Sequence, residues 1–164
     1  YCGVGGSRDC TYHQTHDFYG REYQDAEILE VLLGSPDLAF RRLDGDEVTS
    51  IAAAAIADGE IVGWFQGGSE FGPRAMGHRS ILCDPRKGEM KDVLNDRVKH
   101  REAFRPFAPS VLAERAHEFF DLPAATSPFM LLIVPVREEH RKTVPAITHH
   151  DGTARVQVID RRGR

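Results

Sequence analysis

The sequence has no run of about 18 apolar residues, the length that a membrane-crossing helix needs. Its first residues lack the basic start and apolar centre of a secretory signal. Cysteine is scarce, and Cys2, Cys10 and Cys83 are too few and too widely spaced to suggest a disulfide framework or a zinc site. These absences exclude a membrane span and a signal peptide within this stretch and favour a reducing, cytoplasmic setting.

The composition is typical of a folded domain. The chain has 164 residues, of which 41% are hydrophobic and 28% charged, with a net charge of -4. A chain of this length can bury one hydrophobic core without disulfides or metals. Because it opens with Tyr1 rather than methionine, we expect it to be a piece of a longer protein. We predict that residues 1–22 are a loop or the remnant of a linker and that residues 23–164 form one domain.

Hydrophobic spacing predicts alternating helices and strands. The strand predicted at 61–65 should be buried, the one at 128–136 should be central because it is the most apolar, and the one at 155–159 should be last and half-exposed. Such interleaving indicates an α/β or α+β fold. The predicted helices cover residues 25–33, 48–57, 88–99 and 111–120, and a fourth strand covers 80–83.

Positive charge is concentrated between Glu70 and Ser110, where nine basic residues face six acidic ones in an otherwise acidic chain. This favours a small polyanionic ligand over long nucleic acid. If their segment is extended, Lys99, Arg101 and Arg105 share one face, where they repel one another unless an anion lies between them. The alternative is a solvated helix end with local ion pairs.

The glycine-rich loop at residues 69–80 offers a second set of anion ligands. Arg74 and Arg79 are candidate clamps, because a guanidinium binds phosphate or carboxylate oxygens through two parallel hydrogen bonds. The hydroxyl groups of Ser80 and Ser110 can donate to the same oxygens. The loop has neither Walker A nor dinucleotide-binding spacing.

Several long motifs resemble one family. The strings are GSEFGPRAMGHRSILCDPR, MKDVLNDRVKHREAFRPFAPSVL, SPFM and HHDGTARVQ. They closely resemble the C-terminal, YrdC-like domain of O-carbamoyltransferases that act on nodulation factors and antibiotics, over about residues 61–158. The resemblance implies a twisted mixed sheet with flanking helices. It also implies that the domain binds carbamoyl phosphate and ATP, with Mg²⁺ on the nucleotide, and forms carbamoyl-adenylate. An N-terminal domain of the same polypeptide, which holds the metal-binding histidines, would pass the carbamoyl group to a hydroxyl acceptor.

The resemblance also implies residue roles. The family's K-x-R element is similar to Lys99-His100-Arg101, which with Arg105 would be catalytic. The family has an arginine where this chain has Gly68, and it continues past the DGTARVQ element, so we expect a truncated domain limited to the activation half-reaction. Substrate or nucleotide binding would fall to Arg74, Arg79, Ser80, Ser110, Thr153, Arg155 and Gln157, and no metal ligand is expected.

Three other functions are weighed against this one. A metal hydrolase would use His13, His16 or the pair His149-His150, but adjacent histidines seldom share one ion. A nucleophilic Cys83 lies in an apolar run, where a thiol is usually inert. The remaining alternative is a non-catalytic module that binds nucleotide or RNA phosphates. Only Phe104 and Phe107 lie near the basic residues, so nucleic acid is not the expected partner.

Overall fold

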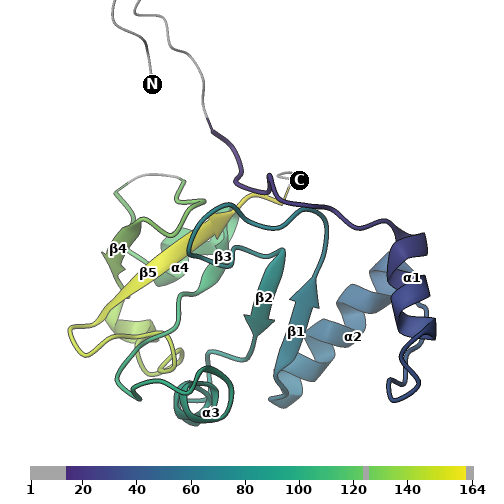
Figure 1. The fold of residues 1–164 in the computed structure, drawn as a ribbon. Helices are drawn as coiled ribbons and strands as arrows, with labels where there is room; N and C mark the ends of the chain where they lie inside the picture. Colours follow the sequence, from purple (N-terminus) through teal and green to yellow (C-terminus); the bar gives the residue numbers. More distant parts are fainter. Residues whose placement is uncertain (1–13, 124–125, 162–164) are drawn as a thin grey trace, which may run out of the picture.

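The computed structural model describes residues 14–123 and 126–161. Helices and strands interleave along the chain, which confirms the α/β class (Figure 1). The helices are α1 (Asp25–Leu33), α2 (Gly45–Asp58), α3 (Glu89–Val93), the π-helical turn η1 (Leu94–Lys99), α4 (Ala113–Phe119) and the short 3-10 helix η2 (Glu138–His140). The strands are β1 (Val62–Phe65), β2 (Arg79–Leu82), β3 (Ser110–Leu112), β4 (Leu132–Pro135) and β5 (Thr153–Ile159). None of the described helices is long and apolar enough to cross a membrane.

The strands form two separate small sheets. β1 and β2 pair antiparallel, with Val62 opposite Leu82. The second sheet has the order β3-β5-β4, in which β5 runs parallel to β3 and antiparallel to β4. β5 is therefore the central strand of a mixed sheet, and α4 lies beside this sheet in Figure 1.

The hydrophobic core lies between the second sheet and α4. From β5 it receives Ala154, Val156 and Val158, which alternate with residues on the opposite face. That opposite face carries Thr153, Arg155 and Gln157. The other buried members of the core are Ala116, Phe120, Val134, Val136, Val144 and Ile147. Burial of the apolar face thus fixes the direction in which the polar residues of β5 point.

For three strands, the predicted burial or position in the sheet is wrong. β1 is not buried, since Phe65 is 55% exposed. β4 is an edge strand rather than the central one, and its Ile133 is 63% exposed. Pro135, which lacks an N–H group, suits an edge position. The strand predicted to be half-exposed is the central one, because it pairs with β3 along one edge and with β4 along the other. Apolar content did not show which strand would gain two partners.

One helix prediction is confirmed in its extent but not in its helix type, and another needed correction. The helix expected at 88–99 is present as α3 followed by the π-helical turn η1. The helix expected at 111–120 begins as β3, because residues 110–112 pair with β5, and becomes helical only at Ala113. By contrast, α1 confirms the helix predicted at 25–33, and α2 contains the one predicted at 48–57.

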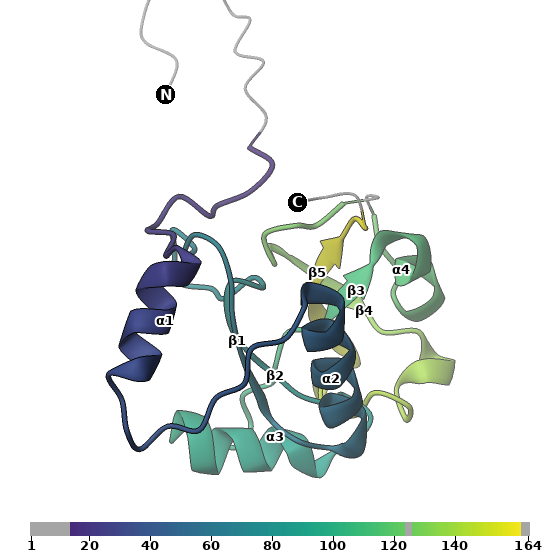
Figure 2. The same ribbon diagram turned by 90° about the vertical axis from the view of Figure 1, so that its right-hand side faces the viewer.

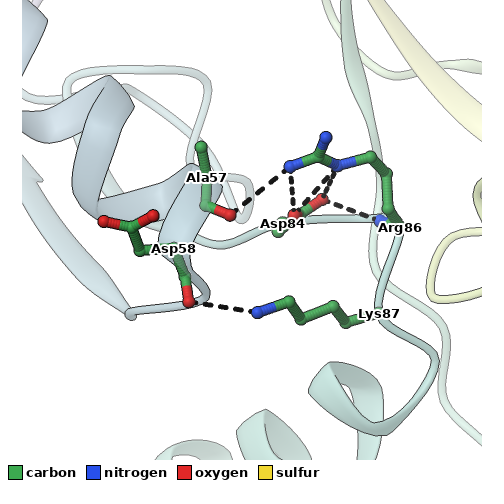
Figure 3. A network of polar contacts seen from close by, with 5 residues as sticks. All are labelled: Ala57, Asp58, Asp84, Arg86 and Lys87. Carbon is green, nitrogen blue, oxygen red and sulfur yellow. Dashed lines mark hydrogen bonds and ion pairs between the residues drawn. The ribbon is translucent and has the colours of Figure 1, made fainter.

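A polar network ties the end of α2 to the loop after β2 (Figure 3). The buried carboxylate of Asp84 accepts hydrogen bonds from the backbone N–H and the guanidinium of Arg86 at 2.7–3.0 Å. These bonds hold the pKa of Asp84 below its usual range, although burial opposes them. Lys87 donates to the carbonyl oxygen of Asp58 at 3.1 Å, so a cation lies at the helix C-terminus, where the helix dipole favours it.

Candidate functional site

A cavity of about 270 Å³ opens beside the polar face of β5. Arg155 on β5 and its cross-strand neighbour Ile133 on β4 form one wall. The other lining residues are Arg101, Arg105, Pro106, Phe107, Ala108 and His149. None of the eight lining residues is acidic. We call this space the cationic cavity.

Arg155 is the least satisfied cation in this cavity. Its Nε atom is buried and has no hydrogen-bond partner among the described residues. Burial, together with repulsion from Arg74 and Arg101, lowers the pKa of the Arg155 guanidinium. A buried donor without a partner is costly, and so is the repulsion between neighbouring cations. An anion bound in the cavity would relieve the repulsion between these cations.

Arg101 is held in place by Asn95, a residue of η1. The Arg101 Nε donates to Oδ1 of Asn95 at 2.7 Å, and the guanidinium stacks on the ring of Phe107 with 4.6 Å to the ring centroid. The Nδ2 of Asn95 donates to the carbonyl oxygens of Ala103 and Arg105, at 3.3 and 2.9 Å. One amide that is 1% exposed therefore positions the segment that carries both arginines.

Sequence reasoning missed Asn95, because neither charge nor a known motif marks it. Its role depends on the π-helical turn, which side-chain spacing did not predict. π-helical turns within α-helices are frequent at functional sites, and the presence of one beside Arg101 is in keeping with that tendency.

The expectation that Lys99, Arg101 and Arg105 share one face of an extended segment is wrong. His100 adopts a left-handed conformation with φ of +47°, and residues 103–104 form a turn. This turn brings Arg101 and Arg105 to the cationic cavity, whereas Lys99 is exposed and does not line it. Arg105 also forms an ion pair with Glu102 at 3.0 Å. A role for Lys99 stays a prediction.

The loop of residues 69–80 is organised by Glu70, a second residue that sequence reasoning missed. One oxygen of Glu70 accepts hydrogen bonds from the backbone N–H groups of Met76, His78 and Arg79, at 2.7, 2.9 and 3.2 Å. Burial alone would raise the pKa of Glu70, but these bonds outweigh it and hold the pKa below its usual value. The same loop carries Arg74, whose charge acts on Arg155.

Arg79 supports this loop from the other side. Its guanidinium donates to the carbonyl oxygens of Gln66 and Gly67, at 2.6 and 2.9 Å, and lies over the ring of Phe65. The Arg79 guanidinium, which was expected to bind an anion, therefore makes its contacts within the fold. In this structure Arg79 holds the loop and does not line the cationic cavity.

The two serines also make bonds within the fold. Ser80 is buried, and its hydroxyl accepts a hydrogen bond from the backbone N–H of Gly77 at 2.9 Å. Ser110 donates to Oε1 of Gln157 at 2.7 Å. Neither hydroxyl lines the cationic cavity.

The polar face of β5 is turned toward the loop, as the alternating pattern predicted. Nε2 of Gln157 donates to the carbonyl oxygen of Met76 at 2.9 Å, which joins β5 to the loop of residues 69–80. Thr153 donates to Oδ1 of Asp151 at 2.7 Å. Thr153 and Gln157 thus hold the neighbouring segments, and Arg155 between them lines the cationic cavity.

His149 is a further lining residue that was not assigned to the site. Its Nδ1 lies 3.4 Å from Oγ1 of Thr153. Burial lowers the pKa of His149; the charge of Asp151 opposes this effect, and that of Arg155 adds to it.

Metal and thiol chemistry find little support in the described part of the chain. No group of three or more His, Cys, Asp or Glu side chains there could hold a metal ion. His13, one of the candidate ligands, lies outside the described residues. Cys83 is partly buried, and burial together with the charge of Asp84 raises the pKa of its thiol, so it is a poor nucleophile.

Comparison with known proteins gives the family. The Carbamoyltransferase C-terminus family matches residues 53–164. The chain belongs to this family. It is 58% identical over 118 residues to nodulation protein NolNO of Sinorhizobium fredii, covering 71% of this chain and 17% of that protein. It is 51% identical over 141 residues to nodulation protein NolO of Bradyrhizobium diazoefficiens, covering 85% of this chain and 25% of that protein. The chain spans a quarter or less of the length of these relatives.

Gly68, where the family resemblance led us to expect an arginine, lies against backbone. A Cβ atom at position 68 would lie 2.8 Å from the carbonyl oxygens of Phe18 and Gly20. Backbone of the preceding segment therefore occupies the space into which a side chain at 68 would project. A side chain at position 68 would therefore require residues 18–20 to move.

We expect Gly68→Ala to lower the free energy of unfolding by about 1–3 kcal/mol, because the new methyl group must displace backbone. Gly63→Ala is the matched control, since a Cβ there meets nothing within 4 Å. Urea denaturation of both variants measures the difference. Equal stability of the two variants would contradict the proposed clash.

Glu70 should make stability depend on pH. Because its folded-state pKa lies below the usual 4.5, its stabilisation is complete above that pH. It is lost as pH falls through the folded-state pKa. Glu70→Gln should cost roughly 1–2 kcal/mol at pH 7 and give a shallower loss of stability in acid. Thermal melts of both proteins between pH 3 and 7 test this, and parallel curves would show that Glu70 does not organise the loop.

Proposed function

We propose that this carbamoyltransferase domain binds carbamoyl phosphate and ATP in the cytoplasm and forms carbamoyl-adenylate. The rest of the polypeptide would then transfer the carbamoyl group to a hydroxyl acceptor. The observation that carries the proposal is Arg155, whose Nε is buried without a partner and whose side chain lines a cavity shared with Arg101 and Arg105. Family membership supports carbamoyl transfer among the reactions of phosphorylated ligands, and the adenylate step is part of the proposal.

The residues present suit these ligands. Arginine forks bind phosphate oxygens through paired hydrogen bonds. Phe107 and Ile133 add apolar wall on which the uncharged part of a ligand could pack. Mg²⁺ would bind mainly through the nucleotide phosphates and water, as it usually does with nucleotides.

The reaction balances when one water is consumed. Water cleaves carbamoyl phosphate to carbamate and inorganic phosphate. A carbamate oxygen then attacks the α-phosphorus of ATP, and the bond to the β-phosphate oxygen breaks, which releases pyrophosphate. Negative charge develops on the transferring and leaving oxygens in both steps. Arg101, Arg105 and Arg155 would stabilise that charge electrostatically, without exchanging protons.

The alternative, a module that binds phosphates without catalysis, predicts the same anion site but no turnover. RNA is the less suitable ligand, because the Arg101 guanidinium already stacks on the ring of Phe107. A base would have to displace this contact in order to stack there.

The test is ATP–pyrophosphate exchange by the complete polypeptide with carbamoyl phosphate and Mg²⁺. The proposal expects labelled pyrophosphate to enter ATP only when carbamoyl phosphate is present. Binding of both ligands without exchange would support the non-catalytic alternative. Absence of binding at millimolar ligand would remove both functions.

A further inference from the structure

The first part of the described chain has helices but almost no core. Among residues 14–60, Asp17 is the only buried residue, and neither α1 nor α2 buries any side chain. A helix of nine residues is not stable in water through its own propensity and depends on packing of an apolar face. Yet Val31 and Leu33 on α1 are 67% and 69% exposed. The described residues therefore do not supply the packing that α1 needs.

An open groove of about 360 Å³ lies between α1 and the segment that leads into α2. Half of its ten lining residues are apolar, and two of the others, Arg42 and Asp25, form an ion pair at 3.4 Å. In Figures 1 and 2 both helices lie beside the β1–β2 sheet, apart from the core at β3-β5-β4. We call α1 together with residues 38–43 the α1 face. The apolar residues that line the groove are Ile28, Leu29, Leu32, Phe40 and Leu43.

We propose that the α1 face is an interface covered by a part of the same polypeptide that lies outside these 164 residues. The similarity to NolO covers 85% of the chain and so leaves out about 25 residues, which means that it reaches α1. This chain corresponds to only 25% of NolO. A relative that shares α1 therefore has ample further chain to cover it.

Charge indicates the chemistry of the covering segment. The α1 face carries three acidic side chains, Asp25, Glu27 and Glu30, and two basic ones, Arg41 and Arg42. An apolar strip flanked by charges of both signs complements such a surface, because charges at the rim of an interface select partners of opposite sign.

The test uses thiol labelling in the complete polypeptide. Val31→Cys places a thiol on the α1 face, and Glu139→Cys places a control thiol on η2, another exposed position. Maleimide labelling is followed at each site by peptide mass spectrometry, with the urea-denatured protein as reference. We expect the thiol at position 31 to react at least tenfold more slowly than the one at position 139. Equal rates would overturn the proposal.

Photo-crosslinking then identifies what covers the face. The photo-reactive amino acid p-benzoylphenylalanine, incorporated at position 31 during synthesis, should form an intrachain crosslink to a peptide from outside residues 1–164. A crosslinked dimer joined through two α1 faces would instead assign the surface to self-association and overturn the proposal. Neither result depends on carbamoyl phosphate or ATP, so this test can fail or succeed independently of the proposed activity.

Discussion

Arg155→Met is expected to weaken binding of carbamoyl phosphate ten- to a hundredfold while leaving the free energy of unfolding unchanged or higher. A charge-assisted contact to phosphate is worth about 1.5–3 kcal/mol, which corresponds to that range of affinity. Stability should not fall, because the substitution removes a buried donor without a partner and relieves repulsion with Arg74 and Arg101. Methionine keeps much of the apolar stem of arginine in place.

Calorimetry and chemical denaturation of the same variant measure the two quantities. Arg115→Met is the control, because Arg115 is an exposed arginine of α4 that pairs with Glu118 and does not line the cationic cavity. It should leave the affinity unchanged. An Arg155→Met protein that binds as well as the parent would refute the anion site. One that binds poorly because it has lost stability would show that Arg155 holds the fold.

Asn95→Ala is expected to weaken anion binding at least tenfold although Asn95 does not line the cavity. Its loss frees the Arg101 guanidinium and the carbonyl oxygens of Ala103 and Arg105, so the segment that carries both arginines loses its anchor. The variant should also lose about 1–3 kcal/mol of stability, because buried hydrogen-bonding groups lose their partner.

Ser127→Ala separates these two effects. Ser127 is 4% exposed and donates to the carbonyl oxygen of Val156 at 2.9 Å, so its removal also deletes a buried hydrogen bond. It does not line the cationic cavity. The control should lose stability but keep its affinity for carbamoyl phosphate at a temperature where both variants are folded. Equal loss of affinity in the two variants would mean that Asn95 acts only through general stability.

The membership of the chain in a carbamoyltransferase family could be predicted from the sequence alone, because long motifs in fixed order do not depend on how the strands are arranged. The same is true of the α/β class and of α1, whose end at Gly34 follows from local chain chemistry. The alternation of β5 was also correct from sequence, since successive side chains of any strand point to opposite faces. These are all local properties of the chain.

The site itself depended on contacts between distant segments. Local pattern could not show that Asn95 would hold Arg101 and Arg105, that Glu70 would bind three backbone amides, or that Arg79 would be occupied by carbonyl oxygens. Nor could apolar content place β5 at the centre of the sheet and β4 at its edge. β5 is central because it pairs with β3 as well as with β4. In the pairing with β3, Ser110 lies opposite Gln157, which is more than forty positions later in the sequence. The sequence alone determined that cations are concentrated between residues 70 and 110. Tertiary structure decided which of these cations lack partners, because hydrogen bonding and burial depend on neighbours that the linear sequence does not reveal.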